Sequence, residues 1–191
     1  MITINPKKES TKSLHHYLLS SVGPRPIALA STIDKNGCPN LSPFSYFNIF
    51  SSNPPILIFS PARRVRDNTT KDTLENAKQV KEVVINVVTY DIVEQMNITS
   101  LEYEKNIDEF IKASFTHLKS DLIKPFRVKE SPIQFECKIN DIISLGKSGG
   151  AGNLIICEIM LIHIDKKILD KENNIDPKKV NLIGRLGFDW Y

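Results

Sequence analysis

The sequence predicts a mainly β protein, an antiparallel barrel or sandwich with short peripheral helices. About six runs rich in β-branched and aromatic residues occur along the chain, most of them linked by turns. The helical segments are short and do not alternate regularly with these runs, as a doubly wound parallel sheet would require. At 191 residues, without a linker or internal repeat, the chain fits one domain over 1–191.

The first expected elements are a helix and a long hairpin. Apolar spacing in "STKSLHHYLLSS" predicts a helix over 10–21, an N-terminal extension with Ser10 as its N-cap. "GPRP" ends it, because proline cannot continue a helix. The segment 27–34 and the aromatic stretch "LSPFSYFNIF" are strands joined by the turn signal "KNG", so 27–48 forms a long hairpin.

The later elements alternate between strands and short helical pieces. Strands are expected at 54–61, 82–90, 133–145 and 153–165, and helices at 73–79, near 91–99, near 106–113 and at 176–181. Asp72 and Glu75 resemble a capping box that opens the helix at Thr73. The glycine-rich "GKSGGAG" lies between two strands, so it is a hairpin loop, because a phosphate-binding glycine loop must open a helix.

Composition narrows the function classes. Hydrophobic content of 41% and charged content of 25% are typical of a globular protein, and no apolar run is long enough to span a membrane. The N-terminus lacks a secretory signal, and the three scattered cysteines fit free thiols in the cytoplasm. A net charge of +3, with both signs interspersed, gives no sign of nucleic-acid binding.

No side chain stands out as a metal ligand or nucleophile. His15 and His16 are adjacent, and His117 and His163 have no carboxylate at ligand spacing. A GxSxG motif is missing as well. If the protein is an enzyme, we therefore expect a cofactor to supply the chemistry.

Two segments suggest a ligand site. "RRVRDNTTKDTLEN" over 63–76 groups cations and threonine hydroxyls at a helix start, which suits a phosphate, although a solvated turn with a capped helix would look the same. "LSPFSYFNIF" over 41–50 mixes aromatic rings with a proline and small polar side chains. That mixture suits a flat ligand with a polar edge. Strand alternation separates Phe44, Tyr46 and Asn48 from the residues between them, unless the strand has a bulge near Pro43.

The order of several blocks resembles a known family. "GPRPIALASTIDKNGCPNLSPFSYFNIFSSNPPILIFSP", "KDTLEN", "VVINVV", "ESPIQFECKI", "GNLIICEI" and "GRLG" together resemble the flavin reductase-like family of FMN-binding split barrels, in particular its flavoredoxin-like branch. The resemblance covers roughly residues 22–191. The chain departs from many relatives in "GRLGFDWY", which has no second glycine after "GRLG", and in the more polar "NTTKDT".

The resemblance implies a six-stranded Greek-key split barrel that works as a homodimer, with FMN in a groove at or near the dimer interface. Ser45 and Asn48 would bind the polar edge of the flavin ring, and Pro43, Phe44 and Tyr46 would cover its apolar parts. The full set that the resemblance implies for FMN is Ser31, Thr32, Ser42, Pro43, Phe44, Ser45, Tyr46, Phe47, Asn48, Ser60, Arg64, Thr70, Lys71, Asp72 and Thr73.

Two functions follow from the resemblance. One is an NAD(P)H:flavin oxidoreductase, with NADH or NADPH as co-substrate and a partner oxygenase or another electron acceptor. The other is an FMN-binding electron-transfer protein without nicotinamide activity. A pyridoxamine-phosphate oxidase-like enzyme on a related barrel fits the order of the blocks less well.

Overall fold

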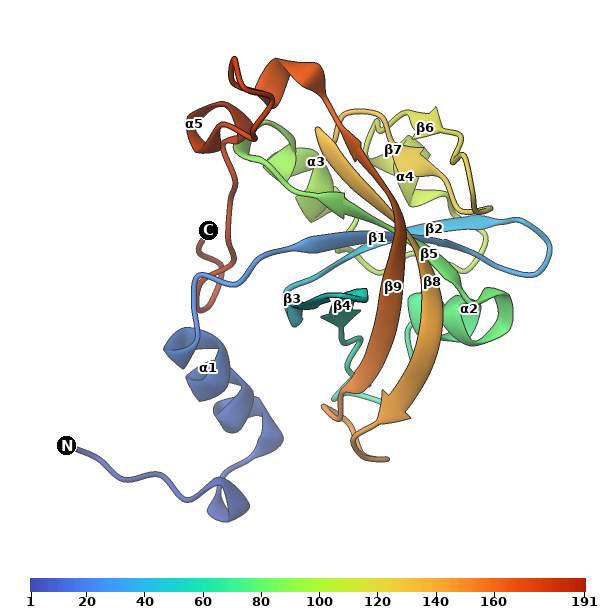
Figure 1. Cartoon of the computed structure of the whole chain (residues 1–191). Helices are drawn as coiled ribbons and strands as arrows, with labels where there is room; N and C mark the ends of the chain where they lie inside the picture. The colour runs from blue at the N-terminus through green and yellow to red at the C-terminus, as the bar shows by residue number, and fades with distance from the viewer.

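The computed structural model describes residues 1–191 and confirms the mainly β class. Seven antiparallel strands, not the six expected, form one sheet in the order β2-β1-β5-β8-β9-β4-β3 (Figure 1). Their bounds are β1 Ala28–Ile33, β2 Pro39–Phe44, β3 Phe47–Ser52, β4 Pro55–Phe59, β5 Glu82–Val87, β8 Ile133–Ser144 and β9 Asn153–Ile164. Two further short strands, β6 His117–Leu118 and β7 Arg127–Val128, form a separate ribbon that the sequence analysis missed.

The helices are short and lie around the sheet, as expected (Figure 1). They are α1 Thr11–Ser21, α2 Asp72–Val80, α3 Val93–Ile98, α4 Glu109–Lys112 and α5 Pro177–Val180, with 3₁₀ turns at Pro6–Lys8, Tyr90–Ile92 and Lys166–Ile168. None of them combines the length and hydropathy that a membrane crossing would require.

The aromatic stretch at 41–50 is divided between two strands. β2 ends at Phe44 and β3 begins at Phe47, so the chain passes from one edge strand of the sheet to the other. β3 then pairs with β4, not with β1. The expected hairpin 27–48 is therefore correct only as far as Phe44, because the seven-strand order places β2 and β3 at opposite edges.

The expected bulge near Pro43 is also wrong. The β1–β2 register runs without interruption from Ala28 opposite Phe44 to Ile33 opposite Pro39. Pro43 needs no bulge because β2 is an edge strand, where a missing N–H donor is tolerated. The register shift occurs instead in the β3–β4 hairpin, between Ile49 and Ser51.

Local sequence predicts the cap of α1 correctly but not the start of α2. Ser10 caps α1 as predicted, since its Oγ accepts the backbone N–H of Ser13 at 3.1 Å. α2 begins one residue earlier than expected, with Lys71 at the N-cap and no side-chain capping bond. The predicted capping box of Asp72 and Glu75 is therefore wrong.

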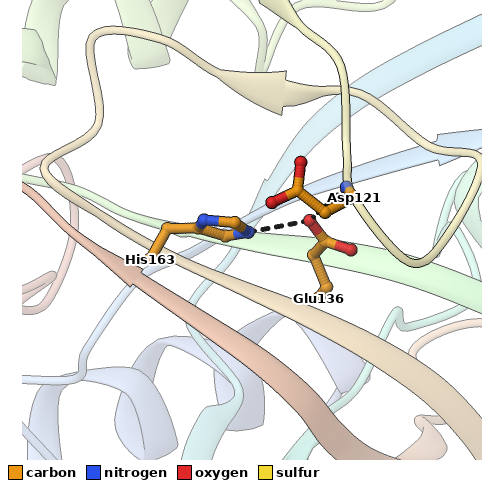
Figure 2. Close-up of side chains that lie close together, drawn as sticks. All are labelled: Asp121, Glu136 and His163. Atoms are coloured by element: carbon orange, nitrogen blue, oxygen red, sulfur yellow. Dashed lines mark hydrogen bonds and ion pairs between the residues drawn. The ribbon is translucent and has the colours of Figure 1, made fainter.

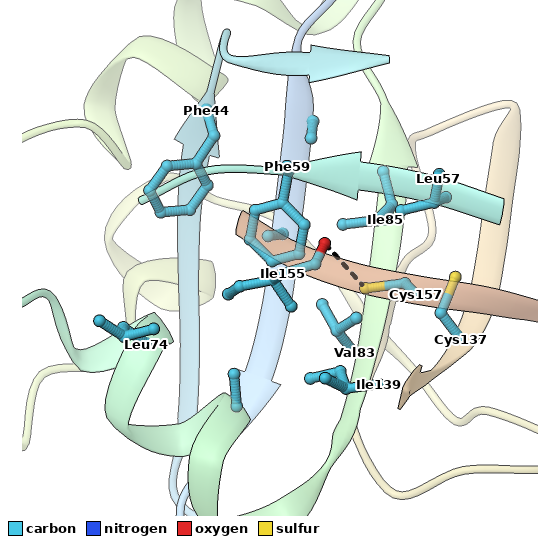
Figure 3. Close-up of a cluster of buried hydrophobic side chains, with 13 residues drawn as sticks. Phe44, Leu57, Phe59, Leu74, Val83, Ile85, Cys137, Ile139, Ile155 and Cys157 are labelled. Atoms are coloured by element: carbon cyan, nitrogen blue, oxygen red, sulfur yellow. Dashed lines mark hydrogen bonds between the residues drawn. The ribbon is translucent and has the colours of Figure 1, made fainter. Parts of the chain in front are cut away.

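The core lies on both faces of β1. Ala28 and Ala30 belong to a cluster with Phe44, Phe59 and residues of α2 (Figure 3). Leu29 belongs to a second cluster that includes residues of α3 and α4. Because neighbouring residues of a strand point to opposite faces, these clusters define the direction of every polar residue in β1 and β2.

Candidate functional site

Lys71 is the central cation of the candidate site. It is half-buried at the N-cap of α2, and its Nζ lies 5.2 Å from the centroid of the Phe44 ring. Burial and then the neighbouring Arg64 lower its pKa, against a smaller opposite effect of Glu102. No carboxylate pairs with Lys71, because Glu102 is bound by Arg64 and Arg66 at 2.9 Å each. A half-buried ammonium group without a counterion suits an anionic ligand.

The first turn of α2 lies beside this lysine. The first N–H groups of a helix have no intrahelical acceptor, and α2 has no side-chain cap to replace one. The Thr73 hydroxyl accepts an N–H from the Asn40 amide at 3.0 Å, and Thr32 Oγ1 accepts from Asn76 at 3.2 Å. Asn40 therefore links β2 to the start of α2. Sequence reasoning missed Asn40, although its alternation with Ser42 and Phe44 could have placed it on their face.

Residues 60–70 form the adjoining wall. Arg64 donates through Nη1 to the Thr69 hydroxyl at 3.2 Å and to the Thr70 carbonyl at 2.5 Å. Ser60 is buried and lies against Gly152, where an added Cβ would be 2.7 Å from the Ser60 Oγ. The glycine loop between β8 and β9 is thus a hairpin loop, as predicted, and it packs on this wall.

The break between β2 and β3 borders the same region. The backbone N–H of Ser60 donates to the Tyr46 carbonyl at 2.9 Å. Arg25 Nε donates to the Ser45 hydroxyl at 3.3 Å. Arg25 is 6% exposed and also donates to the carbonyls of Val22 and Leu186 at 2.7 and 2.8 Å. Arg25, which the sequence analysis did not select, therefore joins the break between β2 and β3 to the end of α1 and to the C-terminal segment.

The structure separates the predicted residues into two groups. Phe44, Arg64, Thr70, Lys71, Asp72 and Thr73 come together, with Thr32 and Ser42 on the adjoining face of β1 and β2 and Ser45, Tyr46 and Ser60 at the strand break. Pro43 points to the opposite face from Phe44.

Three predicted residues lie elsewhere. Ser31 shares the face of Leu29, opposite to Thr32, and its buried Oγ has no hydrogen-bond partner. Phe47 and Asn48 line an apolar cavity of about 460 Å³ with residues of β5, β8 and the C-terminal segment. The expected alternation over 43–48 fails because the strand is interrupted at Ser45 and Tyr46.

A second polar cluster lies away from this site (Figure 2). Glu136 is fully buried and accepts the backbone N–H groups of Asp121 and Leu122 at 2.8 Å each, while His163 Nε2 lies 2.8 Å from its Oε1. Ligand atoms of Asp121, Glu136 and His163 lie within 4.8 Å of one another, as in a metal site. Arg127 Nε lies 3.8 Å from Glu136, however, and opposes a cation there. The cluster therefore ties the segment around 121 to β8 and β9.

The histidines show what sequence spacing missed. His163 pairs with Glu136 across β8 and β9, and His117 Nε2 lies 3.0 Å from Asp108. The prediction that no carboxylate lies at ligand spacing is wrong for His163, whose ligand atom lies within 4.8 Å of those of Asp121 and Glu136, because strand pairing joins residues far apart in sequence.

A family model described as "Flavin reductase like domain" matches residues 20–177. The chain belongs to the flavin reductase-like family.

Relatives and solved structures agree with this assignment. An uncharacterised protein of Aquifex aeolicus is 38% identical and aligns over 97% of this chain and 92% of its own. Nitrilotriacetate monooxygenase component B from Bacillus cereus is 31% identical with a TM-score of 0.92, covering 99% of this chain and 93% of that one. The 2-nitrobenzoate 2-nitroreductase NbaA of Pseudomonas fluorescens is 27% identical with a TM-score of 0.86, covering 98% and 89%.

Other solved structures share the architecture. A split barrel domain protein from Shewanella frigidimarina has a TM-score of 0.84 at 26% identity, covering 100% of this chain and 94% of that one. Flavoredoxin of Desulfovibrio vulgaris has a TM-score of 0.73 at 21% identity, covering 83% and 80%, and shows the fold alone. The split-barrel fold of this flavin reductase-like protein is therefore confirmed.

The residues present fit a flavin mononucleotide. Lys71 and the start of α2 offer donors for a phosphate, and Phe44 with the break at Ser45 and Tyr46 offers aromatic area beside backbone polar groups.

Proposed function

We propose that this chain is an FMN-binding oxidoreductase that transfers a hydride from NADH or NADPH to flavin. The observation that carries the proposal is Lys71, a half-buried cation without a counterion at a helix N-terminus, beside an aromatic ring. Membership of the flavin reductase-like family supports a flavin as the ligand. The hydrogen-bond donors of Lys71 and the start of α2 suit its phosphate.

Each part of the site has a task in this proposal. Lys71, Arg64, Thr70, the start of α2 and Ser60 hold the phosphate. Phe44 and the backbone at Ser45 and Tyr46 orient the ring and keep water from one side of it. The chemistry that FMN supplies when bound is acceptance of a hydride by its ring. Positioning and water exclusion are then the protein's contributions, and no acid or base is required.

The deciding experiment is NADH and NADPH oxidation by the purified protein, with and without added FMN. Flavin-dependent oxidation of either nucleotide supports the reductase. Stable flavin binding without oxidation of either supports instead the second function, an electron-transfer protein reduced by another donor.

One similar solved structure supports a proposal for the electron acceptor. The Bacillus cereus protein is a component of a monooxygenase, so we infer a partner oxygenase as the consumer of reduced flavin. The three free cysteines, two of them buried, agree with a reducing compartment such as the cytoplasm.

We expect Ser45→Leu to weaken riboflavin and FMN binding alike. The larger side chain would fill space beside the proposed ring and remove the hydroxyl that Arg25 holds. Asn48→Leu is the comparator, because Asn48 is exposed, bonds only its neighbour Ile49 and lines the apolar cavity. Riboflavin titration and the melting temperature of each flavin-free variant should be measured together. Loss of stability with flavin affinity retained would place the ring elsewhere.

A homodimer is the expected assembly. Ile49 and Phe50 on β3, and Met160, Ile162 and Ile164 on one face of β9, are 39–64% exposed, and the apolar cavity opens between β3 and β5–β8. Exposed apolar surface of this extent is typical of an interface. Sedimentation should give about twice the chain mass of 21.6 kDa.

A charged substitution tests this face. Ile162→Asp should favour the monomer, whereas Ile111→Asp, at a still more exposed position on α4, should leave the dimer intact. A wild-type monomer that still binds FMN would contradict an interface site.

A further inference from the structure

The C-terminal segment 184–191, "GRLGFDWY", packs against the end of α1 and the residues that lead from α1 into β1. Arg185 pairs its backbone N and O with those of Arg25 at 2.8 and 2.9 Å. Gly184 lies so close to Pro24 that an added Cβ would approach it to 2.7 Å, and Gly187 is packed even more closely on Ser20. These contacts fix the position of Arg185 relative to the break between β2 and β3. Arg25 binds Ser45 at the same break.

Arg185 faces a small cleft of about 170 Å³. The cleft adjoins the proposed flavin segment, because Pro43, Phe44 and Ser45 form one side of it. Its other lining residues are Ile27, Met96, Asn97, Ser100, Arg185 and Tyr191. The cleft is too small for a whole dinucleotide but large enough for one charged group.

The guanidinium of Arg185 is only partly used by the protein. It stacks 4.5 Å above the Tyr191 ring, and its Nη2 donates to the Phe188 carbonyl at 2.7 Å and to Asp189 at 3.1 Å. Asp189 is fully exposed, so this ion pair is easily displaced. Nε and Nη1 have no acceptor, whereas Arg25 uses Nε and both terminal nitrogens.

We propose that Arg185 binds an oxyanion of the second substrate in this cleft, next to the flavin ring. The inference rests on the proposed function for the flavin itself. Two free donors in a fixed planar group match a phosphate or a carboxylate. A nicotinamide dinucleotide would present a phosphate, and an aromatic acid would present a carboxylate.

The test uses the full-length, flavin-loaded protein and its single tryptophan, Trp190, which lies next to Tyr191. Binding of NADH, ADP-ribose, pyrophosphate and benzoate is followed by Trp190 fluorescence in wild type and in Arg185→Gln. The loss of charge-assisted bonds should weaken binding about ten- to a hundred-fold. FMN affinity should stay unchanged, and KM should rise more than kcat falls.

Matched variants separate the outcomes. Asp189→Asn removes the competing carboxylate and should bind the same anions as tightly as wild type or more tightly, whereas Lys35→Gln, in an exposed turn, should change nothing. Weakening of the phosphate ligands identifies a dinucleotide, and weakening of benzoate alone identifies a carboxylate substrate. Unchanged binding of all four ligands in Arg185→Gln overturns the proposal. Arg185-dependent anion binding without nucleotide oxidation would instead refute the reductase and leave the anion site standing.

Discussion

Replacing Lys71 by alanine is expected to raise the dissociation constant for FMN about ten- to a hundred-fold, since a charge-assisted hydrogen bond contributes roughly 1.5–3 kcal/mol. The ammonium group of Lys71 is half-buried and has no protein counterion. A bound phosphate would therefore interact with most of the positive charge of this lysine. Titration of the flavin-free protein with FMN, followed by fluorescence quenching, measures the change.

The fold should survive this change. Lys71 makes no side-chain capping bond, and its contact with Phe44 contributes only about 0.5–1 kcal/mol. Riboflavin, which lacks the phosphate, should bind wild type and variant equally. Lys78→Ala on the same helix is the control, because Lys78 is exposed and pairs with Glu75. Equal FMN affinity of a folded Lys71→Ala variant would remove Lys71 from the phosphate site.

Glu136→Gln should lower the free energy of unfolding by about 3–5 kcal/mol, as removal of one member of a buried ion pair does. The substitution leaves Arg127 and His163, whose side chains are 11% and 19% exposed, without their common partner. Urea unfolding at neutral pH measures the loss. Glu158→Gln is the matched control, because Glu158 lies on β9 but is half-buried and accepts one amide bond. Equal stability of Glu136→Gln and wild type would contradict a structural role.

The same residue gives a pH dependence of defined sign. Burial alone would raise the pKa of Glu136, but the backbone N–H groups of Asp121 and Leu122, together with His163, outweigh it and lower the pKa. A lowered folded-state pKa stabilises the protein above the unfolded value of about 4.3, and this stabilisation is lost as the pH falls through the folded value. Wild type should therefore lose stability below about pH 4.3 more steeply than Glu136→Gln. Parallel acid profiles of the two proteins would refute this contribution.

Local sequence predicted which segments form strands and helices, but not which of them lie next to one another in the fold. Strand-like runs, turn signals and the Ser10 cap located most strands and helices, because these features depend on residues close in sequence. The predicted capping box at Asp72 was wrong, because a local motif cannot show that Lys71 is the N-cap of α2. The β6–β7 ribbon was missed because two-residue strands carry no periodic signal.

The aromatic stretch at 41–50 shows the same difference between local sequence and tertiary structure at the candidate site. Its composition alone indicated a flat ligand, and the cations at 63–71 indicated a phosphate. Sequence could not show that the chain changes sheet edge at Ser45, which sends Phe44 toward Lys71 and Asn48 toward a different cavity.

The sequence by itself determined the fold class, the family and the segments that carry the site, because hydrophobic pattern and motif order are properties of the chain. Only the tertiary structure decided which side chains meet. It left Lys71 without a counterion, joined Arg25 to Ser45, faced Arg185 toward Pro43 and paired Glu136 with His163. These contacts depend on strand order and packing between residues up to 161 positions apart, and no local pattern encodes a distance in space.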